Sequence, residues 1–537
     1  MAPQRISKES NPPMSSDAEV SVAPPVVASA AELAAADKHT YGRILKSSAL
    51  IGGSSMLNIG IGILRTKAMA LLLGPAGFGL MGLYGSIVDL AVSIAGTSIN
   101  GSGVRQIAAA AASGDDQRIA RTATALRRTA ILLGILIAGL LALFSQKVSE
   151  LTFGTDQHAG AVALLSLAVC FQLVAGGQHA LVQGMRRIAD LAKMSVLGAL
   201  YGTMISIPLV YFLREEGVAP SLVCVAAMSI VTSWWYARKV RIQPTAMTVS
   251  EIRREATSLL KLGGAFLASG FLTMGAAYAI RLIVVRNVGL EAAGFYSSGW
   301  TLGGLYVGYI LQAMGTDFYP RLVGVANDNA ECNRLVNEQA HVSLLLAGPG
   351  IIGTLTFAPL VIVMFYSAKF VEAVEILRWI CLGMALRVIT WPMGYIIVAK
   401  NRQLIFIGVE LVWTATYVGL GWACVLHFGL NGAGIAFFGS CVVHGFMIYP
   451  IVRGHSGFRW SAANGKTGLL FLSSIAIVFC SFYLLPPLFA IAIGMSATIL
   501  SAFYTIRTLV NLLTLDQIPR PVRRLLVWLH FAPLGTS

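Results

Sequence analysis

The sequence predicts an all-α protein that crosses a membrane many times. Hydrophobic residues make up 56% of its 537 residues and charged residues only 12%, against about 25% charged residues in a typical soluble domain. The hydrophobic residues gather in stretches of about 20, which is the length of a helix that spans a bilayer. We expect about fourteen transmembrane helices. Their approximate limits are 47–73, 78–100, 129–146, 160–182, 194–213, 219–237, 259–284, 293–314, 342–365, 373–398, 403–427, 431–452, 468–485 and 487–508.

The basic residues follow the alternation of loops that this count requires. Loops after even-numbered spans are basic, and the loops between them carry few Lys or Arg residues. The basic loops contain Arg118, Arg121, Arg127, Arg128, Arg186, Arg187, Lys193, Arg238, Lys239, Arg241, Arg253, Arg254, Lys400, Arg402, Arg453, Arg459 and Lys466. Because short basic loops stay in the cytoplasm, both termini are predicted to be cytoplasmic. The net charge of +15 reflects this topology and does not indicate a nucleic-acid partner.

The two ends of the chain differ from the apolar middle. Residues 1–38 are rich in Ala, Ser, Pro and Val and lack the pattern of a signal peptide, so we expect a disordered cytoplasmic tail. Residues 511–537 form a second cytoplasmic tail, in which mixed Arg and apolar residues suggest a helix lying on the membrane surface. The predicted lobes between them are an N-terminal six-helix lobe (39–240), a C-terminal six-helix lobe (241–455) and an additional transmembrane hairpin (456–510).

An internal repeat supports the two six-helix lobes. Shifting the chain by 215 positions aligns Gly74 with Gly289 and Gly79 with Gly294, and each copy begins a group of six predicted spans. Six is an even number, so both copies have the same orientation in the membrane. A central cavity between two lobes follows from this arrangement.

The sequence disfavours an enzyme and predicts no cofactor. The connecting loops are too short to hold an ATPase, a sugar-nucleotide site or a large periplasmic catalytic loop. Residues 77–82 match the pattern G-x-G-x-x-G, but they join two apolar helices, whereas the dinucleotide fingerprint joins a strand to a helix. The eight histidines and seven cysteines show no spacing typical of a metal site or a disulfide framework.

Four polar residues interrupt the first two predicted spans. Asn58, Arg65 and Lys67 lie in the first span and Asp89 lies in the second. A charge inside a bilayer is expensive and usually has a function. Asn58 and Arg65 are seven residues apart and therefore share one helix face, while Lys67 points almost the opposite way.

The second predicted lobe contains comparable charges. Arg281 lies one position from the repeat equivalent of Arg65, and Arg387 and Glu410 lie within the tenth and eleventh spans. One interpretation is structural, with Arg65 paired to Asp89 and Arg387 paired to Glu410. The other is a cationic cavity for an anionic substrate, because a guanidinium group binds phosphate oxygens in a bidentate manner.

These residues define the candidate site. The substrate-binding candidates are Arg65, Arg281, Arg387, Asn58 and Lys67. The acids Asp89 and Glu410 are candidates for coupling to a proton or sodium ion, with helix-to-helix pairing as their alternative role.

Short motifs near the span ends, in their order and spacing, resemble those of a known family. They are Gly74-Pro75-Ala76-Gly77-Phe78-Gly79, Gly294-Phe295-Tyr296, Tyr319-Pro320-Arg321-Leu322, and Gly394-Tyr395 through Ala399-Lys400. From about Leu45 to Val452 the chain resembles the Wzx-type O-antigen translocases of the multidrug/oligosaccharidyl-lipid/polysaccharide exporter superfamily. Its extra terminal hairpin is similar to the fourteen-span lipid II flippase branch.

The resemblance implies a flippase, in which two six-helix lobes move an undecaprenyl-diphosphate-linked oligosaccharide from the cytoplasmic to the periplasmic leaflet. The glycan would be an O-antigen, exopolysaccharide or similar repeat unit, and a polysaccharide polymerase and chain-length machinery would act beside the flippase in the bacterial inner membrane. Two alternatives remain open. One is a cation-coupled multidrug exporter of the same superfamily, and the other is a membrane polymerase or ligase acting on lipid-linked glycans.

Overall fold

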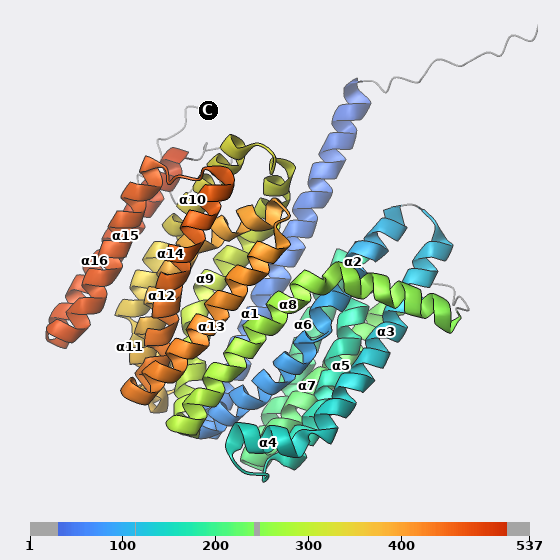
Figure 1. Ribbon diagram of the computed structural model, residues 1–537, viewed down its shortest axis with the longest axis horizontal. Coiled ribbons are helices and arrows are strands. Elements are labelled where there is room, and N and C mark those ends of the chain that lie inside the picture. The colour runs from blue at the N-terminus through green and yellow to red at the C-terminus, as the bar shows by residue number, and fades with distance from the viewer. Residues whose placement is uncertain (1–29, 113, 241–247, 513–537) are drawn as a thin grey trace, which may run out of the picture. The chain divides into compact units, whose positions relative to one another are not determined.

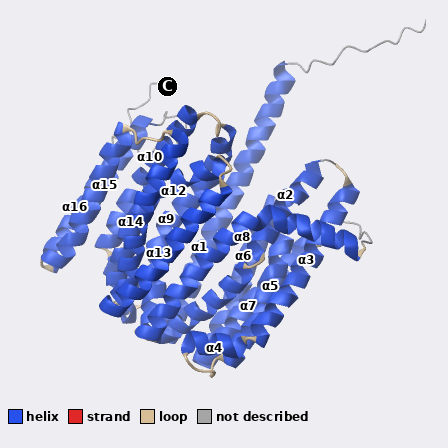
Figure 2. Ribbon diagram, viewed as in Figure 1, coloured by secondary structure: helices blue, strands red, loops and turns tan. Residues whose placement is uncertain are grey.

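The computed structural model describes residues 30–112, 114–240 and 248–512, and within these ranges all regular structure is helical (Figure 2). Residues 30–38 of the expected disordered tail are helical, because the first helix begins at Ala30, whereas residues 1–29 lie outside the described residues. The predicted interfacial helix of the C-terminal tail also lies outside them, because the description ends at residue 512.

Eighteen helical elements follow one another along the described chain. Those of the first half are α1 (Ala30–Ser93), α2 (Gly96–Ala112), α3 (Asp116–Leu143), α4 (Ser145–Phe153), α5 (Ala159–Gly184), α6 (Ile188–Leu213), the 3-10 turn η1 (Arg214–Gly217), α7 (Val218–Ala237) and α8 (Val249–Asn287). Those of the second half are α9 (Leu290–Gly324), α10 (Asn329–Thr356), α11 (Ala358–Phe365), the 3-10 turn η2 (Ala368–Phe370), α12 (Ala373–Ala399), α13 (Gln403–Phe428), α14 (Leu430–Ser456), α15 (Ala462–Leu484) and α16 (Pro487–Leu512).

The protein is a multi-pass membrane protein. Among the described residues, ten helical segments are long and apolar enough to cross a bilayer, or eleven if the bent pair α10 and α11 counts as one span. This number is below the predicted fourteen. Two of the ten segments are much longer than one crossing needs: Gly53–Ser93 has 41 residues and Ile188–Ala237 has 50, where about 20 suffice.

Two glycines interrupt the helices at equivalent positions of the predicted repeat. Gly74 has φ of 66° and breaks α1 just before Pro75, where the fixed φ of proline suits the first turn of a new helix segment. Gly289 has φ of 117° and immediately precedes α9. Positive φ is readily available only to glycine, which explains this residue type at both breaks.

Residues 51–512 contain two groups of mutually packed helices (Figure 1). The N-terminal helix group consists of α2, α3, α5, α6 and α7, and the C-terminal helix group consists of α9, α10, α12, α13 and α14. Helix α8 packs on α2 of one group and on α13 of the other. It therefore links the two groups and places its side chains beside both.

The last two helices are attached to the edge of the C-terminal helix group. Both α15 and α16 pack on α10 (Figure 1). Gly348 of α10 lies against the ring of Phe471, and Gly494 of α16 lies against Thr356. These close contacts between small and larger residues are typical of helix packing in membranes.

Candidate functional site

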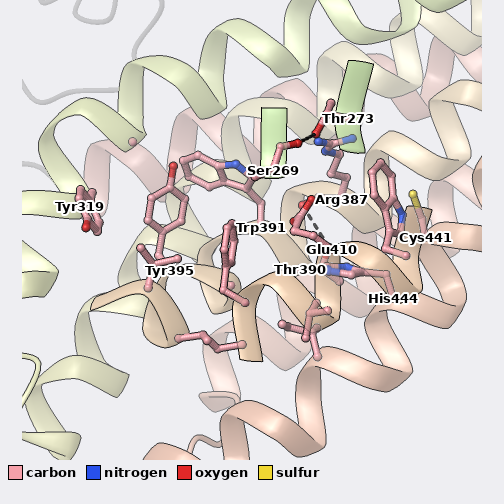
Figure 3. A pocket seen from close by; sticks show the side chains of 18 residues that line it. Ser269, Thr273, Tyr319, Arg387, Thr390, Trp391, Tyr395, Glu410, Cys441 and His444 are labelled. Carbon is pink, nitrogen blue, oxygen red and sulfur yellow. Dashed lines mark hydrogen bonds between the residues drawn. The ribbon is translucent and has the colours of Figure 1, made fainter. Parts of the chain in front are cut away.

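The main cavity of interest lies inside the C-terminal helix group and against α8. It has a volume of about 370 Å³. Five helices supply its walls, namely α8, α9, α12, α13 and α14, and Figure 3 shows the side chains that line it. Its polar and aromatic lining residues are Ser269, Thr273, Tyr319, Arg387, Thr390, Trp391, Tyr395, Phe406, Glu410, Trp413, Cys441 and His444.

This cavity brings together two of the charged residues that the sequence singles out. Arg387 of α12 and Glu410 of α13 both line it (Figure 3). The charge of Arg387 acts on the Glu410 carboxylate, but among the described residues no ion pair within 4.0 Å joins them. Instead, the Arg387 guanidinium carbon lies 5.4 Å from the ring centre of Trp413. The guanidinium group is therefore held by an aromatic face and keeps its donors for another partner.

A row of four aromatic residues continues from Trp413 toward α8. Trp413 stacks on Tyr417 at 5.8 Å, Tyr417 on Trp300 at 6.4 Å and Trp300 on Tyr296 at 6.1 Å between ring centres. The hydroxyls of Tyr296 and Tyr417 are 3.1 Å apart and form a hydrogen bond. At the far end, the guanidinium carbon of Arg281 lies 5.8 Å from the centre of the Tyr296 ring. The aromatic row thus has an arginine at each end, Arg281 and Arg387.

Arg281 also meets the N-terminal half of the protein at Asp89. Among the described residues, the cation whose charge acts on the Asp89 carboxylate is Arg281 of α8, and Asp89 is exposed within the candidate span Gly53–Ser93. Nearby, Leu90 of α1 touches Gly275 of α8. Among the described residues, no ion pair within 4.0 Å joins Asp89 to Arg65 or to Arg281.

Three predicted site residues have buried polar atoms without a hydrogen-bond partner. They are the Nε atoms of Arg65 and Arg281 and the Oδ1 atom of Asn58. Arg281 satisfies one other donor by bonding from Nη1 to the carbonyl of Ala277, at 3.2 Å. Buried polar groups are nearly always hydrogen-bonded, so each exception calls for an explanation. One explanation is that these atoms bind a ligand.

Lys67 has a different environment from the other basic candidates. Its Nζ atom donates a hydrogen bond of 2.6 Å to the carbonyl of Met364 in α11. This bond links α1 to the C-terminal half of the chain. An ammonium group has three donor hydrogens, so two of them are free for other partners.

The aromatic row is the part of the site that the sequence analysis missed. Tyr296 and Trp300 are four residues apart on α9, and Trp413 and Tyr417 are four apart on α13, a spacing that puts each pair on one helix face. This spacing was the available signal. This spacing does not distinguish a binding surface from ordinary core packing, and Tyr296 and Tyr417 are fully buried in the core.

These features define a multi-pass membrane fold with a cavity in its C-terminal helix group, against α8, that contains Arg387, Glu410 and several aromatic residues. A sequence model of the family described as "Polysaccharide biosynthesis protein" matches residues 68–375, more than half of the chain. The chain therefore belongs to the polysaccharide biosynthesis protein family, which confirms the predicted resemblance at the level of the family.

Named relatives fit this assignment. The chain is 22% identical to the lipid III flippase of Escherichia coli (strain K12) over 407 residues, covering 75% of this chain and 96% of that protein. The lipid III flippase of Shigella flexneri matches equally well. The relationship is distant but extends over nearly the whole length of both relatives.

Solved structures show the same fold. The lipid II flippase MurJ in an inward closed conformation superimposes with a TM-score of 0.63 at 13% identity, covering 87% of this chain and 100% of that one. An inward-facing multidrug resistance MATE family transporter of the MOP superfamily superimposes with a TM-score of 0.60 at 14% identity, covering 75% and 99%. At these identities the likeness concerns the fold alone.

Proposed function

We propose that this protein is a flippase for a lipid-linked glycan. It moves an undecaprenyl-diphosphate-linked oligosaccharide, an O-antigen, exopolysaccharide or similar repeat unit, from the cytoplasmic to the periplasmic leaflet of the bacterial inner membrane by alternating access. The observation that carries the proposal is the pair Arg65 and Arg281, each with a buried nitrogen that has no hydrogen-bond partner. The distant relationship to a lipid III flippase supports it.

The charges of the site suit a diphosphate. A buried ion without a partner is unfavourable by several kcal/mol, and a diphosphate supplies about two negative charges and several acceptor oxygens. In this proposal Arg65, Arg281 and Arg387 bind the phosphates, while Asn58 and Lys67 contribute further polar contacts. Trp391, Tyr395 and Trp413, which line the cavity beside Arg387, offer aromatic faces against which the first sugar rings pack.

The proposed topology has fourteen crossings. It follows if Gly53–Ser93 and Ile188–Ala237 each cross twice, the bent pair α10 and α11 crosses once, and α9 adds one crossing. The lobes are then 39–240 and 241–455, with 456–510 as an extra hairpin and both termini in the cytoplasm. The polysaccharide polymerase and chain-length machinery would receive the glycan on the periplasmic side.

The driving force has two sources in this mechanism. An inside-negative potential favours the outward passage of the anionic headgroup, by about 2.3 kcal/mol for each charge and each 100 mV. Asp89 and Glu410 are the acids that would bind a coupling proton or sodium ion. The charge of Arg281 acts on Asp89, and the charge of Arg387 acts on Glu410. Binding of an ion at either acid would therefore change the affinity of the neighbouring arginine for phosphate.

A cation-coupled drug exporter is the second candidate, and its support is that Trp391, Trp413 and Glu410 line one cavity. Such a surface stacks well on an aromatic cation. The arginines at both ends of the aromatic row oppose this function, because they repel a positive ligand.

A binding measurement tests the proposal directly. The purified full-length protein is titrated with undecaprenyl diphosphate, and the Arg65→Gln and Arg281→Gln variants are compared with it. Hydrogen bonds from a charged donor are worth about 1.5–3 kcal/mol, so each variant is expected to bind about 10- to 100-fold more weakly.

The matched control is Arg402→Gln, which removes the same charge from an exposed residue just before α13. Its affinity is expected to equal that of the unmodified protein. Equal affinity in the Arg65→Gln, Arg281→Gln and Arg402→Gln variants would exclude the two buried arginines from the phosphate site.

A further inference from the structure

A second cavity, of about 590 Å³, lies within the N-terminal helix group. It is formed by α3, α5 and α7 and by the residues that directly follow α7. Among the described residues, its lining contains three arginines, no acidic residue and no residue of the C-terminal helix group. The polar and aromatic members of the lining are Thr124, Arg127, Arg128, Gln178, Trp234 and Arg238.

The three arginines come from two elements and meet at one cavity. Arg127 and Arg128 belong to α3, and Arg238 follows the last residue of α7. All three are exposed, and none forms an ion pair within the described parts of the chain. Three cations around one space repel each other, so the arrangement is favoured by an anion placed between them.

Aromatic rings hold one of these arginines in place. The guanidinium carbon of Arg238 lies 4.9 Å from the ring centre of Trp234 and 4.7 Å from that of Trp235. Trp residues are enriched where a protein meets the headgroup region of a bilayer. These contacts orient Arg238 at such a boundary without using its hydrogen-bond donors.

The wall of the cavity on α5 supplies a further donor. Gln178 is buried, and its Oε1 atom accepts a hydrogen bond of 2.5 Å from the hydroxyl of Ser233. This bond occupies the amide oxygen and leaves the NH₂ group to donate. The polar groups of the cavity are therefore predominantly donors, which suits a ligand made of acceptor oxygens.

An apolar surface continues from the cavity along the same helices. Leu132, Ile135 and Leu136 follow Arg128 on α3 and are 61%, 59% and 57% exposed, and Val231 precedes Trp234 on α7 and is 52% exposed. In a transmembrane helix such side chains face lipid tails. A ligand with a charged head and apolar tails can thus place the head among the arginines and the tails on this surface.

We propose that this cavity binds the phosphate headgroup of an anionic phospholipid. Basic pockets between transmembrane helices at the cytoplasmic boundary are suited to such headgroups, and the proposed topology puts this end of α3 and α7 in the cytoplasm. A transported lipid must contact both helix groups as they alternate, whereas a lipid bound here touches only one. It can therefore remain bound throughout the transport cycle.

Native mass spectrometry of the full-length protein tests the proposal. The protein is titrated with phosphatidylglycerol and, separately, with phosphatidylcholine of the same acyl chains. The variant carries Arg127→Gln, Arg128→Gln and Arg238→Gln together. The control carries Arg402→Gln, Arg453→Gln and Arg459→Gln, which remove the same charge from exposed residues around α13 and α14.

We expect the unmodified protein and the control to prefer phosphatidylglycerol by about tenfold or more, because three charged donors contact its phosphate. The variant is expected to lose this preference. Equal preference in variant and control would overturn the proposal. If the triple variant does not fold, the single variant Arg128→Gln is used, and a preference unchanged from the unmodified protein would again overturn it.

A competition arm identifies the source of the phosphate. Undecaprenyl diphosphate is added to the protein loaded with phosphatidylglycerol, and we expect both lipids to be bound at once. Displacement of phosphatidylglycerol at equal concentration would overturn the assignment in favour of the transported lipid. The triple variant is expected to keep its affinity for undecaprenyl diphosphate, so failure here is distinguishable from failure of the proposed flippase function.

Discussion

Gly79 and Gly294, which are 215 residues apart and equivalent under the predicted repeat, lie against each other where α9 begins and where α1 resumes after its break. A Cβ atom added to Gly79 would overlap the carbonyl oxygen of Leu290, and one added to Gly294 would overlap that of Pro75. The backbone of α1 after its break and the backbone of α9 are therefore in direct contact. Gly82 extends the contact, because a Cβ atom there would lie 2.6 Å from the hydroxyl of Ser297.

Substituting these glycines should disrupt the crossing. Gly79→Ala and Gly294→Ala each force two backbones apart, and overpacking of this kind typically destabilises a protein by about 1–3 kcal/mol. We expect a lower midpoint of thermal unfolding and a loss of transport in both variants. Gly85→Ala is the control on the same helix, since nothing lies within 4 Å of a Cβ atom there, and it should be neutral or slightly stabilising.

Arg286 links the N-terminal half of the chain to α8 and should hold one end of the two helix groups together. It donates from Nη2 to the carbonyl of Glu150 at 2.7 Å and from Nε to that of Leu151 at 3.1 Å, at the end of α4. Thr152 and Tyr278 add a hydrogen bond of 2.7 Å between their hydroxyls. Removing the charged donor by Arg286→Gln should favour separation of α4 from α8 by about 1 kcal/mol, or about fivefold in population.

The separation can be measured as a distance between spin labels at Gln157→Cys and Val288→Cys in a protein freed of native cysteines. Arg286→Gln should increase the fraction of long distances. Lys147→Gln is the control, because Lys147 pairs only with Glu150 within α4, at 3.2 Å. A distance distribution that is the same for both variants would show that the Arg286 contacts do not hold this end closed.

A polar contact attaches the last helix pair to α12. Glu375 accepts a hydrogen bond of 2.6 Å from the hydroxyl of Tyr483 and forms an ion pair of 2.9 Å with Arg378, whose guanidinium carbon lies 3.8 Å from the ring centre of Phe482. Tyr483→Phe should destabilise the protein by about 1 kcal/mol. Arg378→Ala should lower the free energy of unfolding by about 2 kcal/mol. This is less than the loss expected on breaking a fully buried ion pair, because Glu375 is partly accessible to solvent.

Thermal unfolding and limited proteolysis between α14 and α15 measure this attachment. The control Ser473→Ala removes only hydrogen bonds to its own helix and should leave both unchanged. If Arg378→Ala is as stable and as protease-resistant as the control, the Glu375 contact does not attach the pair.

Glu410 provides a separate prediction about coupling. Its carboxylate lines the cavity with Arg387, and Glu410→Gln keeps its shape while removing the charge. We expect transport that no longer responds to a proton or sodium gradient, while undecaprenyl diphosphate still binds with an affinity equal to or higher than before. Transport that retains its full response to both gradients would exclude Glu410 as the coupling residue.

The sequence identified the membrane class and the charged residues but not their partners. Hydropathy and the spacing of charges place residues along the predicted spans, and Arg387 and Glu410, a possible ion pair of the tenth and eleventh spans, line one cavity. The position of a residue along a span does not determine the direction in which its side chain points around the helix axis. Asp89 was therefore considered a partner for Arg65, whereas in the structure it lies near Arg281 of α8.

The repeat has the same limitation. It predicts that Gly79 and Gly294 have equivalent surroundings, but equivalence does not say that the two residues touch. The aromatic row was missed for a related reason, since Trp and Tyr at helical spacing are usual in a core. The structure adds their position between Arg281 and Arg387, which no spacing in the sequence indicates.

The most direct measurement follows a fluorescent undecaprenyl-diphosphate oligosaccharide in liposomes that contain the purified protein, with and without an imposed membrane potential. A flippase should transfer the lipid to the opposite leaflet only when protein is present, and faster when the potential drives the anionic headgroup across. A fluorescent cationic dye should not be transported in parallel vesicles. Extrusion of the dye with no movement of the lipid would contradict the proposed function.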